Sequence, residues 1–339
     1  MGVNVSTSSA ANDRLRQAKG WLEARSPAEE ILILAGTGDA GNELVRDLVH
    51  AKGAAFGWHR LSLAQLAAVL AAPVLATRNV VALGSLGVQA ICARVVHKLA
   101  AESALGRYSE IASGPGFSRA FSRVVTELRL AGVDSDAVRT VAPDLKPLFE
   151  AYEANLADGR FTDWAGVLAA ATEALMADNI THRLVGLPTL LLDVAVTNEA
   201  ELSFVRALSA RTTELLVLAP AADEQTLVRI REALRLKVDD VDHSKNSGGL
   251  PGLGTDGSLM RLQERLFAGW SKNDNKGAPA EADARVVFSS DYRRYIFFCV
   301  QVVVAASHTP LAATQSASVF AIVEFSRGAA PAFCSSSQA

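Results

Sequence analysis

Three short runs of mostly apolar residues stand out along the chain, at residues 30–35, 188–193 and 214–219. Runs of this length, bounded by polar or small residues, are typical of parallel strands that are covered on both faces of a sheet. Segments with apolar residues at helical spacing follow all three, at residues 42–51, 199–210 and 225–236. Alternation of strands and helices predicts an α/β fold with a parallel sheet.

The stretch between the first and second of these strands carries mainly helical patterns. The clearest covers residues 116–131, and residues 144–156 and 163–176 have the same spacing. We therefore predict a helical subdomain, at about residues 84–179, inserted into an α/β core that spans residues 30–240.

The two ends of the chain differ from this core. Residues 1–29 comprise a serine-rich stretch that is expected to fray and a short amphipathic helix. Residues 241–284 predict a linker with one helix. Acidic residues almost vanish from Asp291 onward, and Val, Ser, Ala and Phe dominate. Two interpretations of residues 285–339 stay open: the truncated start of a second α/β domain, or a sequence that is out of frame.

The composition narrows the class of protein. Of the 339 residues, 50% are hydrophobic and 20% are charged, which excludes global disorder. The net charge of −3 means that contact with nucleic acid would need local basic patches. No apolar run is long enough to span a membrane, and the polar N-terminal region predicts a soluble, cytoplasmic protein. The three cysteines, Cys92, Cys299 and Cys334, are too far apart for a zinc knuckle, and we predict no metal site and no cofactor.

A glycine-rich turn follows the first predicted strand at residues 36–41. Gly36, Gly38 and Gly41 match the G-x-G-x-x-G fingerprint, which makes an NAD(P)-dependent Rossmann oxidoreductase the alternative function. About 20 positions later the chain has no acidic residue that could bind the ribose hydroxyl of NAD, although Arg60 could contact the 2′-phosphate of NADP. The next predicted parallel strand lies more than about a hundred residues further on, which weighs against this alternative.

The same turn can be aligned with the phosphate-binding loop G-x-x-x-x-G-K-[ST]. Gly36 and Gly41 fit, but Asn42 stands at the lysine position and Glu43 at the hydroxyl position. A neutral amide cannot neutralise the β- and γ-phosphates, and the carboxylate of Glu43 would repel them. We therefore expect no hydrolysis here, and the turn could instead serve packing or the close approach of a phosphate.

The order of the predicted elements resembles the first core domain of superfamily 1 (UvrD-like) helicases over roughly residues 30–240. It is most similar to the inactivated version in the B subunit of AddAB-type helicase–nucleases, a PD-(D/E)XK nuclease family. The resemblance implies a RecA-like (P-loop NTPase-type) core that binds single-stranded DNA or DNA ends during double-strand-break repair and recombination. It also implies an AddA-type helicase partner, and a chain that is an N-terminal fragment without the nuclease module.

Residues that would contact DNA follow from this resemblance and from the charge pattern. Thr37 resembles the first residue of the family's DNA-contacting T-x-x-A element, and His59 is similar to its His–Ser–Phe segment. His59 and Arg60 follow a tryptophan and could stack on a base and contact a phosphate, or could simply be solvated. Arg119 and Arg123 lie one helical turn apart on a polar face, which is either a DNA contact or a solvated surface.

The resemblance also implies a vestigial nucleotide site. Asp193 stands at the end of the strand that binds magnesium in active relatives, but the catalytic glutamate that follows there is replaced by Val194. Asp223 and Gln225 resemble the element that senses the γ-phosphate. We therefore predict a dead ATPase site without catalytic residues, formed by Gly36, Gly41, Asn42, Asp193, Asp223 and Gln225.

Overall fold

The computed structural model describes residues 2–235, apart from Pro27, Ala55, Pro115 and Asn179, and three short strands at 241–243, 299–302 and 317–320. The side chains of residues 51, 52 and 241–243 and of the last two strands are outside this description. The chain divides into two compact units, Met1–Gly248 and Gly249–Ala339.

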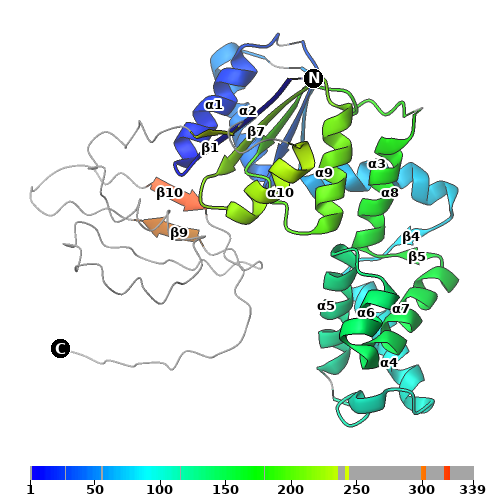
Figure 1. The fold of residues 1–339 in the computed structure, drawn as a ribbon. Coiled ribbons are helices and arrows are strands. Elements are labelled where there is room, and N and C mark those ends of the chain that lie inside the picture. Colours follow the sequence, from blue (N-terminus) through cyan, green and yellow to red (C-terminus); the bar gives the residue numbers. More distant parts are fainter. Residues whose placement is uncertain are drawn as a thin grey trace, which may run out of the picture. The chain divides into compact units, whose positions relative to one another are not determined.

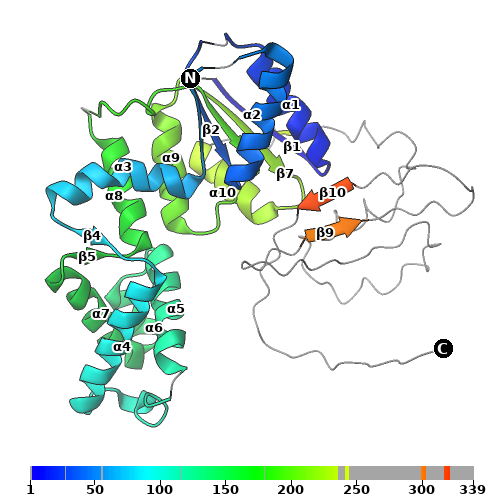
Figure 2. The ribbon, with the colours of Figure 1, turned by 180° about the vertical axis from the view of Figure 1, so that it is seen from behind.

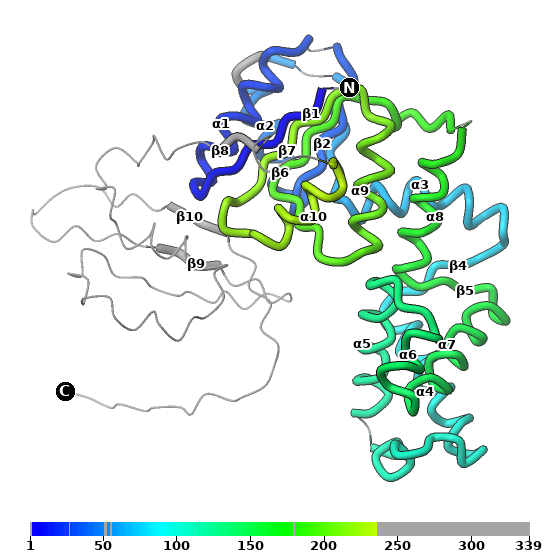
Figure 3. The backbone as a smooth tube through the Cα atoms, in the orientation of Figure 1, coloured from blue at the N-terminus to red at the C-terminus, as the bar shows by residue number. Residues whose placement is uncertain are grey.

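The first unit contains a six-stranded sheet in which every neighbouring pair is parallel (Figures 1 and 3). This confirms the predicted α/β class with a parallel sheet. The strand order across the sheet is β3-β2-β6-β7-β1-β8. The strands are β1 (Gly2–Ser8), β2 (Ile31–Ala35), β3 (Trp58–Leu61), β6 (Thr189–Leu192), β7 (Glu214–Pro220) and β8 (Val241–His243).

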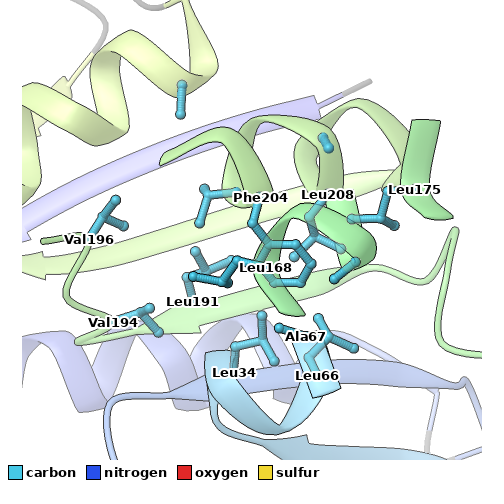
Figure 4. Packing of buried hydrophobic residues seen from close by; sticks show 14 of the residues in the cluster. Leu34, Leu66, Ala67, Leu168, Leu175, Leu191, Val194, Val196, Phe204 and Leu208 are labelled. Carbon is cyan, nitrogen blue, oxygen red and sulfur yellow. The ribbon is translucent and has the colours of Figure 1, made fainter. Parts of the chain in front are cut away.

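Helices cover both faces of this sheet, because alternate residues of its buried strands point to opposite sides. Ile31 and Ile33 of β2 pack with helices α1 (Ala11–Glu23) and α2 (Gly38–Lys52), which are seen in front of the sheet in Figure 2. Leu32 and Leu34 belong to the cluster on the other face, part of which is drawn in Figure 4. The helices of that face are α3 (Leu63–Thr77), α8 (Trp164–Met176), α9 (Glu199–Arg211) and α10 (Glu224–Leu234).

The predicted helical insertion is present and has a hydrophobic cluster of its own, centred on Phe149 and Tyr152. Its entry and exit are joined by two short parallel strands, β4 (Val81–Ala82) and β5 (Phe161–Thr162). Helix α8, which the prediction placed inside the insertion, packs on the sheet instead. Between β4 and β5 lie α4 (Ser85–Ala101), η1 (Gly106–Tyr108), α5 (Phe117–Leu130), α6 (Ser135–Val141), η2 (Pro143–Leu145) and α7 (Lys146–Asp158).

The N-terminal residues form a strand, and the prediction that they fray is wrong. β1 lies between β7 and β8 and pairs with β7 over its whole length. The apolar pattern of a buried strand is missing because Ser6, Thr7 and Ser8 are polar although all three are buried. β8 likewise lies inside the stretch that was predicted to be a linker.

β3 corrects a second expectation. It pairs in parallel with β2, so the next parallel strand follows the glycine-rich turn after a single helix and not after more than about a hundred residues. An edge strand is wetted on one side, and His59 and Arg60 break its apolar run. β2, α2 and β3 thus form a complete βαβ unit.

In the second unit the described residues form an antiparallel pair of strands, β9 (Cys299–Val302) and β10 (Ala317–Phe320). The helix predicted within residues 241–284 lies outside the described residues, and so does the beginning of the segment at 285–339. Among the helices that the structure describes, none combines the length and the apolar character that crossing a membrane requires.

Candidate functional site

The carboxyl ends of the parallel strands meet at one edge of the sheet, where open α/β folds bind ligands. Ser8 ends β1, Gly36 follows β2, and Asp193 follows β6. This edge therefore holds the predicted acid and the predicted glycine turn. It also holds the turn between β1 and α1, which the sequence analysis did not consider.

Arg14, in the second turn of α1, binds Asp193 through two hydrogen bonds. Its Nε donates to Oδ1 at 2.6 Å and its Nη2 donates to Oδ2 at 3.1 Å. The remaining Nη1 donates to the backbone carbonyl of Ser8 at 2.6 Å. The Arg14 side chain is 7% exposed and that of Asp193 is 38% exposed, so the guanidinium is the buried partner. A fork-on-fork arrangement of this kind is the strongest form of an ion pair.

The turn from β1 to α1 satisfies its own polar groups. Ser8 Oγ accepts from the backbone N–H of Ala10 at 3.1 Å and donates to Asp13 Oδ2 at 3.3 Å. Asp13 is buried in the first turn of α1, where a negative charge stabilises a helix, and it pairs with Arg16 at 2.9 Å. A sequence signal that could have located this helix start is the acid in the first turn of an amphipathic helix, here Asp13.

Gly36 and Asp193 touch through their backbones. The N–H of Gly36 donates to the carbonyl of Leu192 at 3.0 Å. A Cβ at position 36 would lie 2.4 Å from the carbonyl oxygen of Asp193, which excludes any side chain there. Asp193 itself has a left-handed backbone with φ of 52°, which Asp and Asn tolerate better than most residues. Close packing therefore accounts for this glycine without a ligand.

The other residues of the predicted nucleotide site have separate surroundings. Gly41 is buried on α2, and a Cβ there would be 3.4 Å from that of Ala35, so it too serves packing against the sheet. Asp223 caps α10 and accepts from the N–H of Thr226 at 3.1 Å. Gln225 is exposed in the first turn of the same helix.

A pocket of about 400 Å³ lies along β3 and brings together three of the predicted residues, His59, Arg60 and Asn42. We call it the β3-edge pocket. It also contains two basic residues that the sequence analysis missed, His182 and Arg183, from the loop before β6. None of its lining residues within the described part of the chain is acidic. The lining consists of Asn42, Trp58, His59, Arg60, Leu61, Val69, His182, Arg183 and Leu184.

His59 is half-buried in this pocket. Its Nε2 is buried without a hydrogen-bond partner, and Glu30 Oε2 lies 3.8 Å away, which is too long for a hydrogen bond. Arg60 and Arg183 are exposed. The structure records no ion pair between either arginine and any described residue.

The remaining predicted DNA contacts lie elsewhere. Thr37 is the N-cap of α2, and its Oγ1 accepts from the N–H of Ala40 at 3.2 Å. Arg119 and Arg123 are exposed on α5 in the helical insertion and do not line the β3-edge pocket. Among the described residues no group of three or more His, Cys, Asp and Glu side chains is arranged to hold a metal ion.

Comparison with protein-family models finds no match to this chain, and comparison with curated proteins finds none either.

Proposed function

We propose that this chain is a non-catalytic, helicase-like domain that binds single-stranded DNA. The observation that carries the proposal is the double hydrogen bond from Arg14 to Asp193. Both carboxylate oxygens accept from the guanidinium, so a magnesium ion could bind them only by displacing or facing a fixed positive charge. Asp193 thus has a structural partner in place of a metal.

The other parts of an ATPase are also missing from this edge. The turn between β1 and α1 consists of Ser9 and Ala10, and α1 begins with Ala11 and Asn12, so this segment has no lysine to neutralise a triphosphate. Val194 follows the acid where a general base would be needed. Phosphoryl transfer depends on positive charge and on a positioned nucleophile, so we expect no turnover of ATP.

The RecA-like form of the core belongs to this proposal. It is supported by a strand–turn–helix, β1 to α1, whose turn shares an edge of a parallel sheet with Asp193. DNA binding is supported by His59 and Arg60, which face one pocket lined by basic and apolar side chains. The role in double-strand-break end processing, with an AddA-type helicase subunit, rests on the resemblance alone.

The competing function is a dinucleotide-binding oxidoreductase at residues 36–41. One observation favours it. The chain passes from β2 to β3 on one side and from β6 to β7 on the other, so the sheet has a topological switch point between β2 and β6. Against it, Asp39 brings a negative charge to the first turn of α2, where a pyrophosphate would lie. β3 also ends at Leu61 and is followed by Ser62, so no acid stands there for the ribose.

Ligand-induced thermal shifts separate these functions. We expect the full chain to be stabilised by an oligothymidylate at low salt, and not by NADPH or by ATP with magnesium. Stabilisation by NADPH without any effect of the oligonucleotide would reject the proposal. ATP hydrolysis that is abolished by Asp193→Asn would show that the site is active after all.

A further inference from the structure

We infer that the β3-edge pocket holds backbone phosphates of single-stranded DNA, and that His182 and Arg183 are phosphate contacts together with Arg60. This inference rests on the proposed function and assigns its binding site. It adds two residues from the loop before β6 that neither a motif nor the family resemblance indicated.

The pocket follows the free edge of the sheet. All four residues of β3 line it, although neighbouring residues of a strand point to opposite faces. Trp58 packs on the side of α1 and α2, whereas Leu61 packs on the side of α3 and α8. A pocket that contacts the side chains on both faces of β3 must pass around the backbone of this edge strand.

The edge itself offers hydrogen-bond donors. The N–H of Ile31 donates to the carbonyl of Gly57, so in a parallel ladder the alternate residues Trp58 and Arg60 direct their backbone N–H groups away from β2. Backbone N–H groups and arginine side chains are common phosphate ligands in protein–DNA contacts. The edge therefore supplies fixed donors, together with the carbonyls of the same residues, beside the exposed guanidinium groups.

The side-chain chemistry of the pocket fits an anion. Arg60 and Arg183 approach it from different segments, and neither has an acidic partner among the described residues. Nδ1 of His182 accepts from the N–H of Leu184 at 3.3 Å, so the proton of the neutral ring lies on Nε2, which can donate to a phosphate. Val69, which is 41% exposed, adds an apolar surface for a sugar or a base.

An extended acidic peptide is the competing occupant, because an unpaired edge can also accept a strand. β3 is only four residues long, and a short edge strand offers few pairing positions to a peptide. Phosphates need only the donors and the two arginines. We therefore assign the pocket to a phosphodiester backbone.

The test is the binding of a fluorescein-labelled oligothymidylate to the full chain, followed by anisotropy between about 50 and about 200 mM salt. We expect His182→Ala/Arg183→Ala to weaken binding about tenfold, and each lost phosphate contact to reduce the slope of log K against log salt by about 0.7. Arg60→Gln should likewise weaken binding and reduce the slope. The matched control is His97→Ala/Lys98→Ala, which removes an exposed histidine–cation pair from α4, outside the pocket.

The outcomes are distinguishable. If the unaltered chain binds the oligonucleotide but the pocket variants bind it with the same affinity and the same salt slope, this site is wrong while the proposed function stands. If the unaltered chain does not bind it at all, the proposed function fails and this inference fails with it. We do not expect a polyglutamate peptide to displace the oligonucleotide. Binding of that peptide alone, lost in the pocket variants, would assign the pocket to a protein partner.

Discussion

Arg14 and Asp193 lie 179 positions apart in the sequence, and the guanidinium of the first binds both carboxylate oxygens of the second. The pair ties the first helix of the chain to the loop that follows a central strand. Because Arg14 also binds the carbonyl of Ser8, the same guanidinium fixes the end of β1. The N-terminal segment is therefore an integral part of the sheet.

The two partners of this pair should differ in the cost of their removal. Asp193→Asn leaves a buried guanidinium without its counter-charge, whereas Arg14→Met leaves a carboxylate that is 38% exposed and can be hydrated. We expect the free energy of unfolding to fall by about 2–4 kcal/mol for Asp193→Asn and by about 1–2 kcal/mol for Arg14→Met. Urea unfolding of both variants measures this difference.

Asparagine is the suitable replacement because it tolerates the left-handed backbone of Asp193, so the effect reports the charge and not backbone strain. The double variant should be more stable than the sum of the single losses predicts, since the cost of an unpaired charge is then removed. Equal losses for the two single variants and strict additivity in the double variant would contradict the pairing.

The strands that the sequence predicts correctly are those buried on both faces. Ile31–Ala35 and Thr189–Leu192 are continuous apolar runs, and the physical reason for that pattern, contact with helices on each side, holds for both. β1 and β3 escape prediction for different reasons. The buried end of β1 is polar at Ser6–Ser8, and β3 is an edge strand that carries the polar residues His59 and Arg60.

The candidate site could be predicted only in part. Asp193 was recognisable because an acid that directly follows a buried strand is a local pattern. Its partner Arg14 was not, because nothing local to either residue relates them. His182 and Arg183 join His59 and Arg60 through the pairing of β2 with β3 and β6, which a linear pattern does not contain.

A buried carboxylate anchors the helical insertion to the helix that follows it. Asp163, 3% exposed, accepts from Arg129 Nε at 2.6 Å, from Tyr152 Oη at 3.1 Å and from the N–H of Gly166 at 3.0 Å. Asp163→Ala removes an ion pair and the N-cap of α8 together. We expect it to lower the free energy of unfolding by about 2–4 kcal/mol and Tyr152→Phe to lower it by about 1 kcal/mol.

Hydrogen exchange locates this effect. Faster exchange in α5 and α7 of the Asp163→Ala variant, with the strands β2, β6 and β7 still protected, is the expected pattern, because the insertion has its own hydrophobic cluster. A uniform loss of protection across the chain would show that Asp163 does not act on the insertion.

The thiol of Cys92 should be inert in the folded protein. It is buried in α4, and this burial, with a further contribution from the Asp163 carboxylate, raises the pKa of Cys92 to about 12. A rise of about three pH units above the ordinary value lowers the thiolate fraction about a thousandfold at neutral pH. In a Cys299→Ser/Cys334→Ser variant, maleimide labelling should be at least about a hundredfold slower than in urea. Rapid labelling under native conditions would contradict the burial.

Acid should weaken the contact between α1 and β7 through Glu214. The hydrogen bond from Arg25 lowers the pKa of Glu214 below its ordinary value, partial burial opposes the shift, and the bond from Trp21 Nε1 at 2.9 Å adds to it. Because the pKa is lower in the folded state, the carboxylate stabilises the fold at pH values above 4.5, and this contribution is lost as the pH falls further. Glu214→Gln should therefore lower the urea midpoint at pH 7 and have a smaller effect near pH 3. The same change at exposed Glu110 should shift neither midpoint, and an effect of Glu214→Gln that grows on acidification would contradict the sign of the shift.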